Sequence, residues 1–175
     1  MLTNPNQLIL YHHKIIQILK KTKDHTKWRK KAESILNNHK TNHNRIMRFH
    51  TRKWVKPEDL NPNGTLFGGQ LLAWIDEEAA LYTIIQLENS KIVTKYISEI
   101  NFMSSAKQGD IVEIGIDVVS FGKSSLTLKC EARNTMTRET ILTVDNIIMV
   151  NLSDDGKPKP HGKTQIEFIR DRLKP

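Results

Sequence analysis

The stretch from residue 61 to residue 87 constrains the fold more than any other part of the chain. It opens with the turn dipeptides Asn-Pro and Asn-Gly and continues through the pair Gly68-Gly69. From Gln70 through Leu87 no glycine or proline interrupts a helix, and apolar residues occur on every side of it. A helix that is apolar all round is a buried helix, and this one holds too many polar residues to span a membrane. The sequence therefore predicts a long helix enclosed by the rest of the fold. Three acids lie within it: Asp76, Glu77 and Glu78.

The start of this helix has the features of a ligand site. A helix that begins at Gly68-Gly69 presents backbone N–H groups that no side chain covers, and such donors suit a ligand oxygen or phosphate. Asp76 follows Gly69 by seven residues, about two turns, so both project on the same face. A carboxylate beside amide donors can act as a base or nucleophile next to an oxyanion site. The alternative is that the glycines only permit tight packing and that Asp76 only pairs with a base. Glu77 and Glu78 have equally apolar neighbours, so spacing does not single out Asp76.

Segments on both sides of the helix predict β-strands, because apolar and β-branched residues alternate or cluster in them. One strand, one buried helix and then four strands joined by short turns make an α+β fold in which an antiparallel sheet wraps a long helix. A single sheet covers only one side of a helix. The other side is expected to pack on a second copy, which predicts at least a dimer. The expected strands are residues 48–55, 92–102, 111–119, 126–132 and 140–152.

Four blocks of the chain resemble one known family. They are Asn-Pro-Asn-Gly-Thr-Leu-Phe-Gly-Gly-Gln-Leu-Leu-Ala-Trp-Ile-Asp-Glu-Glu-Ala at 61–79, Val-Thr-Lys-Tyr-Ile-Ser-Glu-Ile-Asn-Phe at 93–102, Gly-Asp-Ile-Val-Glu at 109–113 and Phe-Gly-Lys-Ser-Ser-Leu at 121–126. Together they resemble the hotdog-fold acyl-CoA thioesterases of the single-domain bacterial, YciA-like type. The resemblance covers roughly residues 47–159. It implies a hotdog fold, in which the antiparallel sheet wraps a central helix.

The resemblance implies a catalytic site without a metal. Asp76 occupies the position of the Asp that acts as general base or nucleophile at the thioester. Asn61 matches an Asn that helps to hold the water or the carbonyl from the other subunit, although a turn-forming Asn is the alternative. The amides of Gly68 and Gly69 would polarise the thioester oxygen, and Thr94 matches a threonine beside the site. An oxyanion acceptor and an activated water are what thioester hydrolysis requires.

The substrate-binding residues that the resemblance implies lie farther along the chain. The turn from Gly122 to Ser125 resembles the one that touches the coenzyme A nucleotide, and it offers free amides, two hydroxyls (Ser124 and Ser125) and the cation of Lys123. Many relatives carry Arg at the position of Lys123, so a point charge replaces a bidentate phosphate contact. An ordinary hairpin with a polar tip is the alternative. Phe102 is a further candidate, for contact with the acyl chain.

Other residues give weaker signals. Lys157 and Lys159 can add nucleotide contacts or belong to a solvated tail. His50 and His161 are isolated and are interpreted as surface residues; the central helix contains no histidine, which argues against a hotdog dehydratase. Cys130 falls within a strand pattern and is interpreted as a core residue. No Cys/His cluster has zinc spacing. No cofactor is expected, since coenzyme A is part of the substrate.

The positive charge is concentrated at the head of the chain. The net charge is +8, but residues 1–56 hold 14 Lys/Arg and two acids, whereas residues 57–175 hold 13 Lys/Arg and 17 acids. Residues 1–45 predict two basic amphipathic helices and an Asn-rich linker, interpreted as an appendage that packs on the domain or on a sister subunit. Nucleic-acid binding, a membrane-surface helix and an organelle transit peptide are the weaker alternatives.

The residues and the resemblance together predict a cytoplasmic acyl-CoA thioesterase of fatty acid metabolism, which cleaves acyl-CoA to free acid and coenzyme A. The expected organisation is a basic helical extension (1–45), a hotdog domain (46–160) and a C-terminal tail (161–175) with a short helix near residues 166–173. The homo-oligomer is at least a dimer, and the trimers of dimers common in the family make a hexamer plausible. The main alternative is a regulator that senses acyl-CoA without cleaving it and contacts nucleic acid through its basic head. A weaker one is an acyl-carrier-protein or aryl-CoA thioesterase on the same fold.

Overall fold

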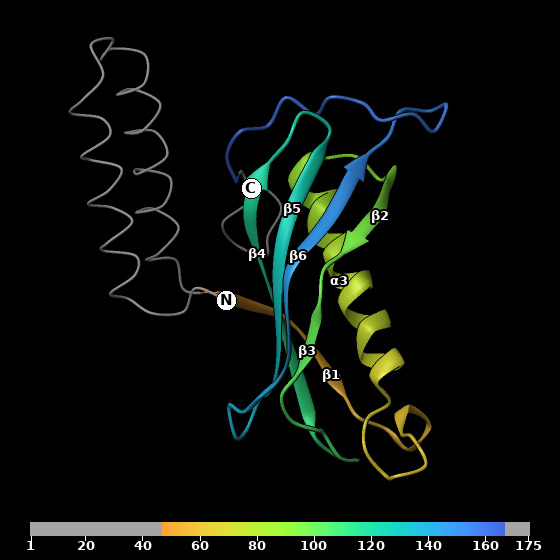
Figure 1. Cartoon of the computed structure of the whole chain (residues 1–175), viewed down its shortest axis with the longest axis vertical. Helices are drawn as coiled ribbons and strands as arrows, with labels where there is room; N and C mark the ends of the chain where they lie inside the picture. Colours follow the sequence, from red (N-terminus) through yellow and green to blue (C-terminus); the bar gives the residue numbers. More distant parts are fainter. Residues whose placement is uncertain (1–46, 167–175) are drawn as a thin grey trace, which may run out of the picture. The chain divides into compact units, whose positions relative to one another are not determined.

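The structure, a computed structural model, describes residues 47–166 (Figure 1). The predicted helices of residues 1–45 and nearly all of the predicted terminal helix lie outside the described residues, so the three-part organisation of the chain stays a prediction. Within the described part the elements follow in this order: β1 (Arg48–Trp54), a 3₁₀ turn η1 (Pro57–Asp59), α3 (Gly68–Leu87), β2 (Ile92–Ile97), β3 (Ile100–Phe102), β4 (Ile111–Phe121), β5 (Ser125–Asn134) and β6 (Thr140–Asn151).

All strands belong to one antiparallel sheet in the order β1-β4-β5-β6-β2, and β3 also pairs with β6. The long helix α3 lies along this sheet (Figure 1) and contacts β2, β4, β5 and β6. The predicted α+β architecture, a sheet against one long helix, is therefore confirmed. No helix among the described residues has the length and apolar character needed to cross a membrane.

The core lies between the helix and one face of the sheet. In β5 every second residue is buried, as its alternating pattern predicts, because successive side chains of a strand point to opposite faces. The neighbouring β4 contributes branched side chains to the same face of the sheet, and α3 packs over that face. The largest buried contributions come from Val112, Ile114, Ile116, Leu126, Leu128, Leu142, Ile147 and Met149 of the sheet and from Leu71 and Ile75 of the helix.

The opposite face of the sheet is held by ion pairs. Glu113 of β4 is only 2% exposed. Its carboxylate accepts hydrogen bonds from Arg133 Nε at 2.7 Å and from Arg138 Nη1 at 2.5 Å, and Arg52 Nε lies 3.9 Å away. A buried carboxylate requires such partners, since an unpaired charge is costly to remove from water. These contacts join β1, β4, β5 and the turn before β6.

The helix is not enclosed on every side within the described part of one chain. Ala73, Glu77, Leu81 and Ile85 recur every four residues and are exposed, the last two at 49% and 46%. The expectation of complete enclosure is therefore wrong for a single chain. The physical reason is the one that predicted a dimer: one sheet covers one side of a helix and leaves the other open.

The boundaries of the elements differ from the predictions where tertiary contacts decide them. The start of the helix is not one of these differences, because α3 begins at Gly68, within the expected Gly68-Gly69 pair. The strand expected over 92–102 divides at Ser98, whose hydroxyl accepts a hydrogen bond from the amide of Asn146 at 3.1 Å and whose own amide donates to the Asn146 carbonyl at 2.8 Å. β4 runs on to Phe121, because a bulge after Val118 shifts its register without ending the pairing.

Candidate active site

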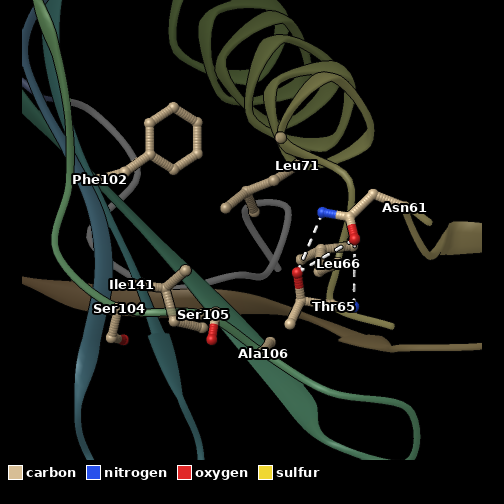
Figure 2. A pocket seen from close by; sticks show the side chains of 10 residues that line it. Asn61, Thr65, Leu66, Leu71, Phe102, Ser104, Ser105, Ala106 and Ile141 are labelled. Atoms are coloured by element: carbon tan, nitrogen blue, oxygen red, sulfur yellow. Dashed lines mark hydrogen bonds between the residues drawn. The ribbon is translucent and has the colours of Figure 1, made fainter. Parts of the chain in front are cut away.

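The loop before α3 is built around Asn61. Its side-chain oxygen accepts hydrogen bonds from the amides of Asn63 at 2.9 Å and Thr65 at 3.3 Å, and its Nδ2 donates to Thr65 Oγ1 at 3.0 Å. An Asn side chain that bonds the backbone two residues on forms an Asx turn. Asn61 thus has the turn-forming role that the sequence left open, and it also borders the pocket at the helix start (Figure 2).

This pocket has a volume of about 250 Å³ and lies beside the first turn of α3. Figure 2 shows Asn61 and Thr65 on one side of it and Phe102 on the other. Its apolar lining comes from the helix and from the sheet, so the cavity connects the two layers of the fold. The lining residues are Asn61, Thr65, Leu66, Gly68, Leu71, Phe102, Ser104, Ser105, Ala106 and Ile141.

The two glycines at the helix start lie directly against aromatic rings. A Cβ on Gly68 would stand 3.1 Å from Phe102 Cζ, and one on Gly69 would stand 2.6 Å from Phe67 Cε1. The glycines therefore permit close packing, as the simpler interpretation of the sequence held. Phe67, the residue before the helix, makes no side-chain capping hydrogen bond. The first amides of α3 thus remain available as donors beside the pocket.

The structure separates the three acids of the helix, which the sequence does not. Glu77 is exposed and pairs with Lys53 Nζ at 2.8 Å. Glu78 is buried, and its carboxylate accepts a hydrogen bond from the Thr51 hydroxyl. Asp76 is half-buried, and its Oδ1 accepts a hydrogen bond from Thr94 Oγ1 at 2.5 Å. Among residues 47–166, Asp76 is thus the helix acid that is neither paired with a cation nor enclosed in the core.

Thr94 belongs to β2, an edge strand of the sheet, and its backbone is opposite Met149 of β6. The register shifts between Thr94 and Tyr96, so the strand bends just after the threonine. The predicted association of Thr94 with Asp76 is therefore present in a single chain. A hydroxyl that donates to one carboxylate oxygen fixes the plane of the carboxylate and leaves the second oxygen for another donor.

A single chain does not gather all the predicted site residues at one place. Asn61, Gly68 and Phe102 lie around the pocket, and Gly69 adjoins it, whereas Asp76 and Thr94 are not among the lining residues. The turn from Gly122 to Ser125 forms a third location, between β4 and β5. Such a division is what the resemblance implies, since it assigns Asn61 and Asp76 to different subunits.

The turn from Gly122 to Ser125 was expected to offer free amides, and the structure shows that the amide of Gly122 is not one of them. Gly122 N–H donates to the Ser125 carbonyl at 2.8 Å, and a Cβ on Gly122 would collide with the Ser125 side chain. His161 differs from its prediction as an isolated surface residue: it is half-buried and contacts this turn. No local sequence pattern indicates this contact, because it joins residues 36 positions apart.

Cys130 and His50 have surroundings that do not indicate a catalytic role. Cys130 is buried, as predicted, and burial together with the nearby charge of Glu78 raises the pKa of its thiol far above the ordinary range. A protonated thiol is a poor nucleophile. His50 is half-buried, with its ring 6.0 Å from that of Tyr82. Among residues 47–166, no group of three or more His, Cys, Asp or Glu side chains could hold a metal ion.

The sequence and the fold are similar to those of known proteins. The model of the family described as the thioesterase superfamily matches residues 63–141. A structure described as an apo-hexameric acyl-CoA thioesterase is 35% identical, with a TM-score of 0.57 over 63% of this chain and 72% of that one. The chain belongs to the thioesterase superfamily, and its fold is the hotdog fold.

Two further proteins that the chain resembles are described as acyl-CoA hydrolases. The acyl-CoA hydrolase of Staphylococcus aureus is 31% identical with a TM-score of 0.57, over 63% of this chain and 66% of that one. A Buchnera aphidicola protein described as an uncharacterized acyl-CoA thioester hydrolase is 33% identical over 43% of this chain and 55% of its own length. The chain thus spans little more than half of that curated relative. Solved variants of the S. aureus enzyme replace one Asp, one Asn and one Thr with Ala.

Proposed function

We propose that the chain is an acyl-CoA thioesterase, which hydrolyses acyl-CoA to a free acid and coenzyme A. The observation that carries this proposal is Asp76: of the three helix acids, it alone is half-buried, with a single hydroxyl partner and no cation partner in the part of the chain that the structure describes. The named activities of the similar proteins support the same reaction. A cytoplasmic location is part of the proposal, and the absence of a membrane-crossing helix among the described residues agrees with it.

The spacing of the site residues supports their proposed roles. In the S. aureus enzyme, the Asp and the Asn that were replaced in separate variants stand 15 residues apart, and Asn61 and Asp76 have the same separation. The third replaced residue is a Thr that stands 17 residues after the Asp, whereas Thr94 stands 18 residues after Asp76, so this separation differs by one residue. We assign Asp76 and Asn61 as catalytic residues and Thr94 as a residue of the substrate site.

In the proposed mechanism Asp76 acts at the thioester carbonyl. Thr94 holds one carboxylate oxygen, and the other oxygen either removes a proton from water or attacks the carbonyl carbon itself. Negative charge then develops on the carbonyl oxygen, and the uncapped amides at Gly68 and Gly69 stabilise it. Asn61 orients the water or the carbonyl. The thiolate of coenzyme A leaves when the carbon–sulfur bond breaks. On the nucleophilic route the acyl group is then bound to Asp76 as an anhydride, and water hydrolyses it to release the free acid and restore the carboxylate.

The working site is proposed to form between copies of the chain. The pocket holds Asn61 and the helix start but not Asp76, so the second copy brings its Asp76 to the first copy's pocket. The exposed apolar line of α3 supports association, since Leu81 and Ile85 would otherwise remain in water. The similar hexameric enzyme favours a hexamer as the final assembly.

The remaining substrate contacts are proposed at the pocket beside the start of α3 and at the turn between β4 and β5. Phe102 lines the pocket. We propose that it contacts the acyl chain. The turn from Gly122 to Ser125, with the cation of Lys123, binds the nucleotide of coenzyme A. No cofactor is proposed, because coenzyme A enters as part of the substrate.

The test is thiol release from a panel of acyl-CoAs of short to long chain length, with the wild type, Asp76→Asn and Asp76→Ala. We expect turnover by the wild type and a loss of about 10²- to 10⁴-fold in both variants, the usual contribution of a general base. The matched control is Glu77→Gln, which removes one charge at the next residue on the exposed side.

Two outcomes contradict the proposal in different ways. If the wild type binds acyl-CoA but cleaves none of the panel, the chain is an acyl-CoA sensor rather than a hydrolase. If both Asp76 variants remain active, the chain is a thioesterase whose base is another residue.

A further inference from the structure

The β4–β5 turn is held by the segment that follows β6. We call residues 157–163 the tail segment. Its chain runs back past the end of β6, where Leu152 pairs with Pro158 and the amide of Lys159 donates to the Asn151 carbonyl at 2.9 Å. It then reaches the turn, and the amide of His161 donates to the Lys123 carbonyl at 3.2 Å. The tail segment therefore connects the last strand to a turn that precedes it by about 35 residues.

His161 makes the most specific of these contacts. Its Nδ1 accepts a hydrogen bond from the amide of Lys163 at 3.1 Å. An amide can only donate, so the neutral ring carries its proton on Nε2. That nitrogen lies 3.2 Å from the Ser125 carbonyl and donates to it. The ring also lies against Phe121, with centroids 6.3 Å apart. The imidazole thus contacts both ends of the turn.

Asn151, the last residue of β6, also bonds both the turn and the tail segment. It is 3% exposed, its amide donates to the Ser124 carbonyl at 2.8 Å, and its Nδ2 donates to the Lys159 carbonyl at 2.8 Å. The carbonyls of three consecutive turn residues, Lys123, Ser124 and Ser125, therefore all accept hydrogen bonds from the tail segment or from β6.

This arrangement decides where the amides of the turn point. The described peptide bonds are trans, so the N–H of each residue points opposite to the carbonyl of the residue before it. Because the Lys123 carbonyl faces His161, the Ser124 N–H faces away from the tail segment. Within residues 47–166, the amides of Lys123 and Ser124 make no backbone hydrogen bond.

The charges around the turn suit a phosphate. Lys157 is paired with Asp155 at 3.2 Å and Lys163 with Glu88 at 2.9 Å. Lys123 and Lys159 are exposed and form no ion pair with the described residues. An outward amide in a turn that carries Lys123, with Lys159 in the tail segment that contacts this turn, provides the charge-assisted donors that phosphate oxygens accept.

We propose that His161 is a positioning residue for coenzyme A: through its bond to Ser125 and its backbone bond to Lys123, it fixes the turn that binds the nucleotide phosphates. The inference rests on the proposed function, because it takes coenzyme A as the ligand of the turn. His161 itself does not contact the reacting thioester. Its loss should weaken binding of the nucleotide and leave the chemical step unchanged.

The test uses two substitutions, each of which retains one of the two hydrogen bonds of the His161 ring. His161→Gln is long enough for its amide nitrogen to donate to the Ser125 carbonyl. His161→Asn retains an oxygen acceptor near Lys163 N–H but is too short to reach Ser125. The control is Thr164→Ala, at an exposed position beyond the tail segment. All are compared in the full chain, with melting temperature as the measure of folding.

The first measurement is the Kd of coenzyme A by calorimetry. We expect His161→Asn to raise it about five- to tenfold, the effect of losing one hydrogen bond, and His161→Gln to restore most of the affinity. With acyl-CoA as substrate, KM should rise by a similar factor while kcat stays unchanged. With an S-acyl-N-acetylcysteamine, which lacks the nucleotide, kcat/KM of the variants should equal that of the wild type.

The outcomes separate this inference from the proposed function. An unchanged Kd for coenzyme A in folded His161→Asn overturns the inference, and so does an equal loss with the short thioester. A wild type that does not bind coenzyme A overturns it as well. If the wild type cleaves no acyl-CoA but binds coenzyme A more tightly than His161→Asn does, the inference holds and the proposed hydrolysis fails.

Discussion

Among single residues, Thr94 offers the sharpest test of how Asp76 is held. Its hydroxyl is the hydrogen-bond donor seen on Asp76 Oδ1, at 2.5 Å. Without it the carboxylate can rotate away from the direction that serves catalysis. The effect should appear in the rate of the reaction rather than in the stability of the fold, because Thr94 lies on an edge strand and is half-buried.

We expect Thr94→Val to lower kcat about ten- to hundredfold, since hydrogen bonds to charged groups contribute about 1.5–3 kcal/mol. Val has nearly the same shape and lacks only the hydroxyl. The measurement is steady-state thiol release, with Thr94→Ser as the control that keeps the donor. A Val variant as fast as the wild type would show that the hydrogen bond has no catalytic role.

Residue-level prediction from the sequence was limited by partners that lie far along the chain. Asp76, Glu77 and Glu78 have equivalent helical neighbours, and their differences come from Thr94, Lys53 and Thr51, which lie 18 to 27 residues away. Resemblance to a family, and not spacing, singles out position 76. The sequence likewise predicts a surface residue at His161, because no local pattern indicates its bond to Ser125.

Among the elements, α3 has two faces with different energetic roles. Ile75 is 1% exposed and packs in the core, whereas Ile85 is 46% exposed on the open side. The two positions carry the same residue type in one helix, so they form a matched pair. They differ only in what covers them.

We expect Ile75→Ala to lower the free energy of unfolding by about 2–4 kcal/mol at any protein concentration, because it leaves a cavity in the core. Ile85→Ala should cost less, and its cost should grow with protein concentration if a second copy covers that face. Urea unfolding at several protein concentrations measures both. If the loss of unfolding free energy caused by Ile85→Ala stays the same at every protein concentration, this side of the helix does not form an interface.

The elements themselves were largely predictable. Alternation in β5 and the absence of breakers in α3 depend on neighbours within one strand or helix, and such patterns are local. The interruption between β2 and β3 was not predictable, since it depends on hydrogen bonds between Ser98 and Asn146, 48 residues apart. The continuation of β4 past Val119 depends likewise on its pairing with β5.

At the scale of the whole molecule, the question is whether one catalytic site uses two chains. Asn61 borders the pocket and Asp76 does not. If each site takes its Asn from one copy and its Asp from another, two inactive variants can complement each other. A mixed dimer would contain one site with both residues intact and one site with neither.

We expect Asn61→Ala and Asp76→Ala to be nearly inactive separately and to recover about a quarter of the wild-type activity after random mixing of subunits in equal amounts. The fraction follows from dimer statistics: about half of the dimers are mixed, and half of their sites are intact. Co-refolding followed by thiol-release assay measures it. No recovery in assembled mixtures would place both residues in one chain's site.

The contacts of the tail segment also set limits on how the chain can be altered in the laboratory. Asn151, Lys159 and His161 connect the end of β6 to a turn outside it, so a deletion before Lys163 would release the turn as well as the tail. An affinity tag or a fluorescent reporter belongs after residue 166, where Ile166 still packs beside the core. Placed at the exposed Asp154-Asp155 tip, the same reporter would disturb the segment that joins β6 to the tail segment and its contacts with the turn.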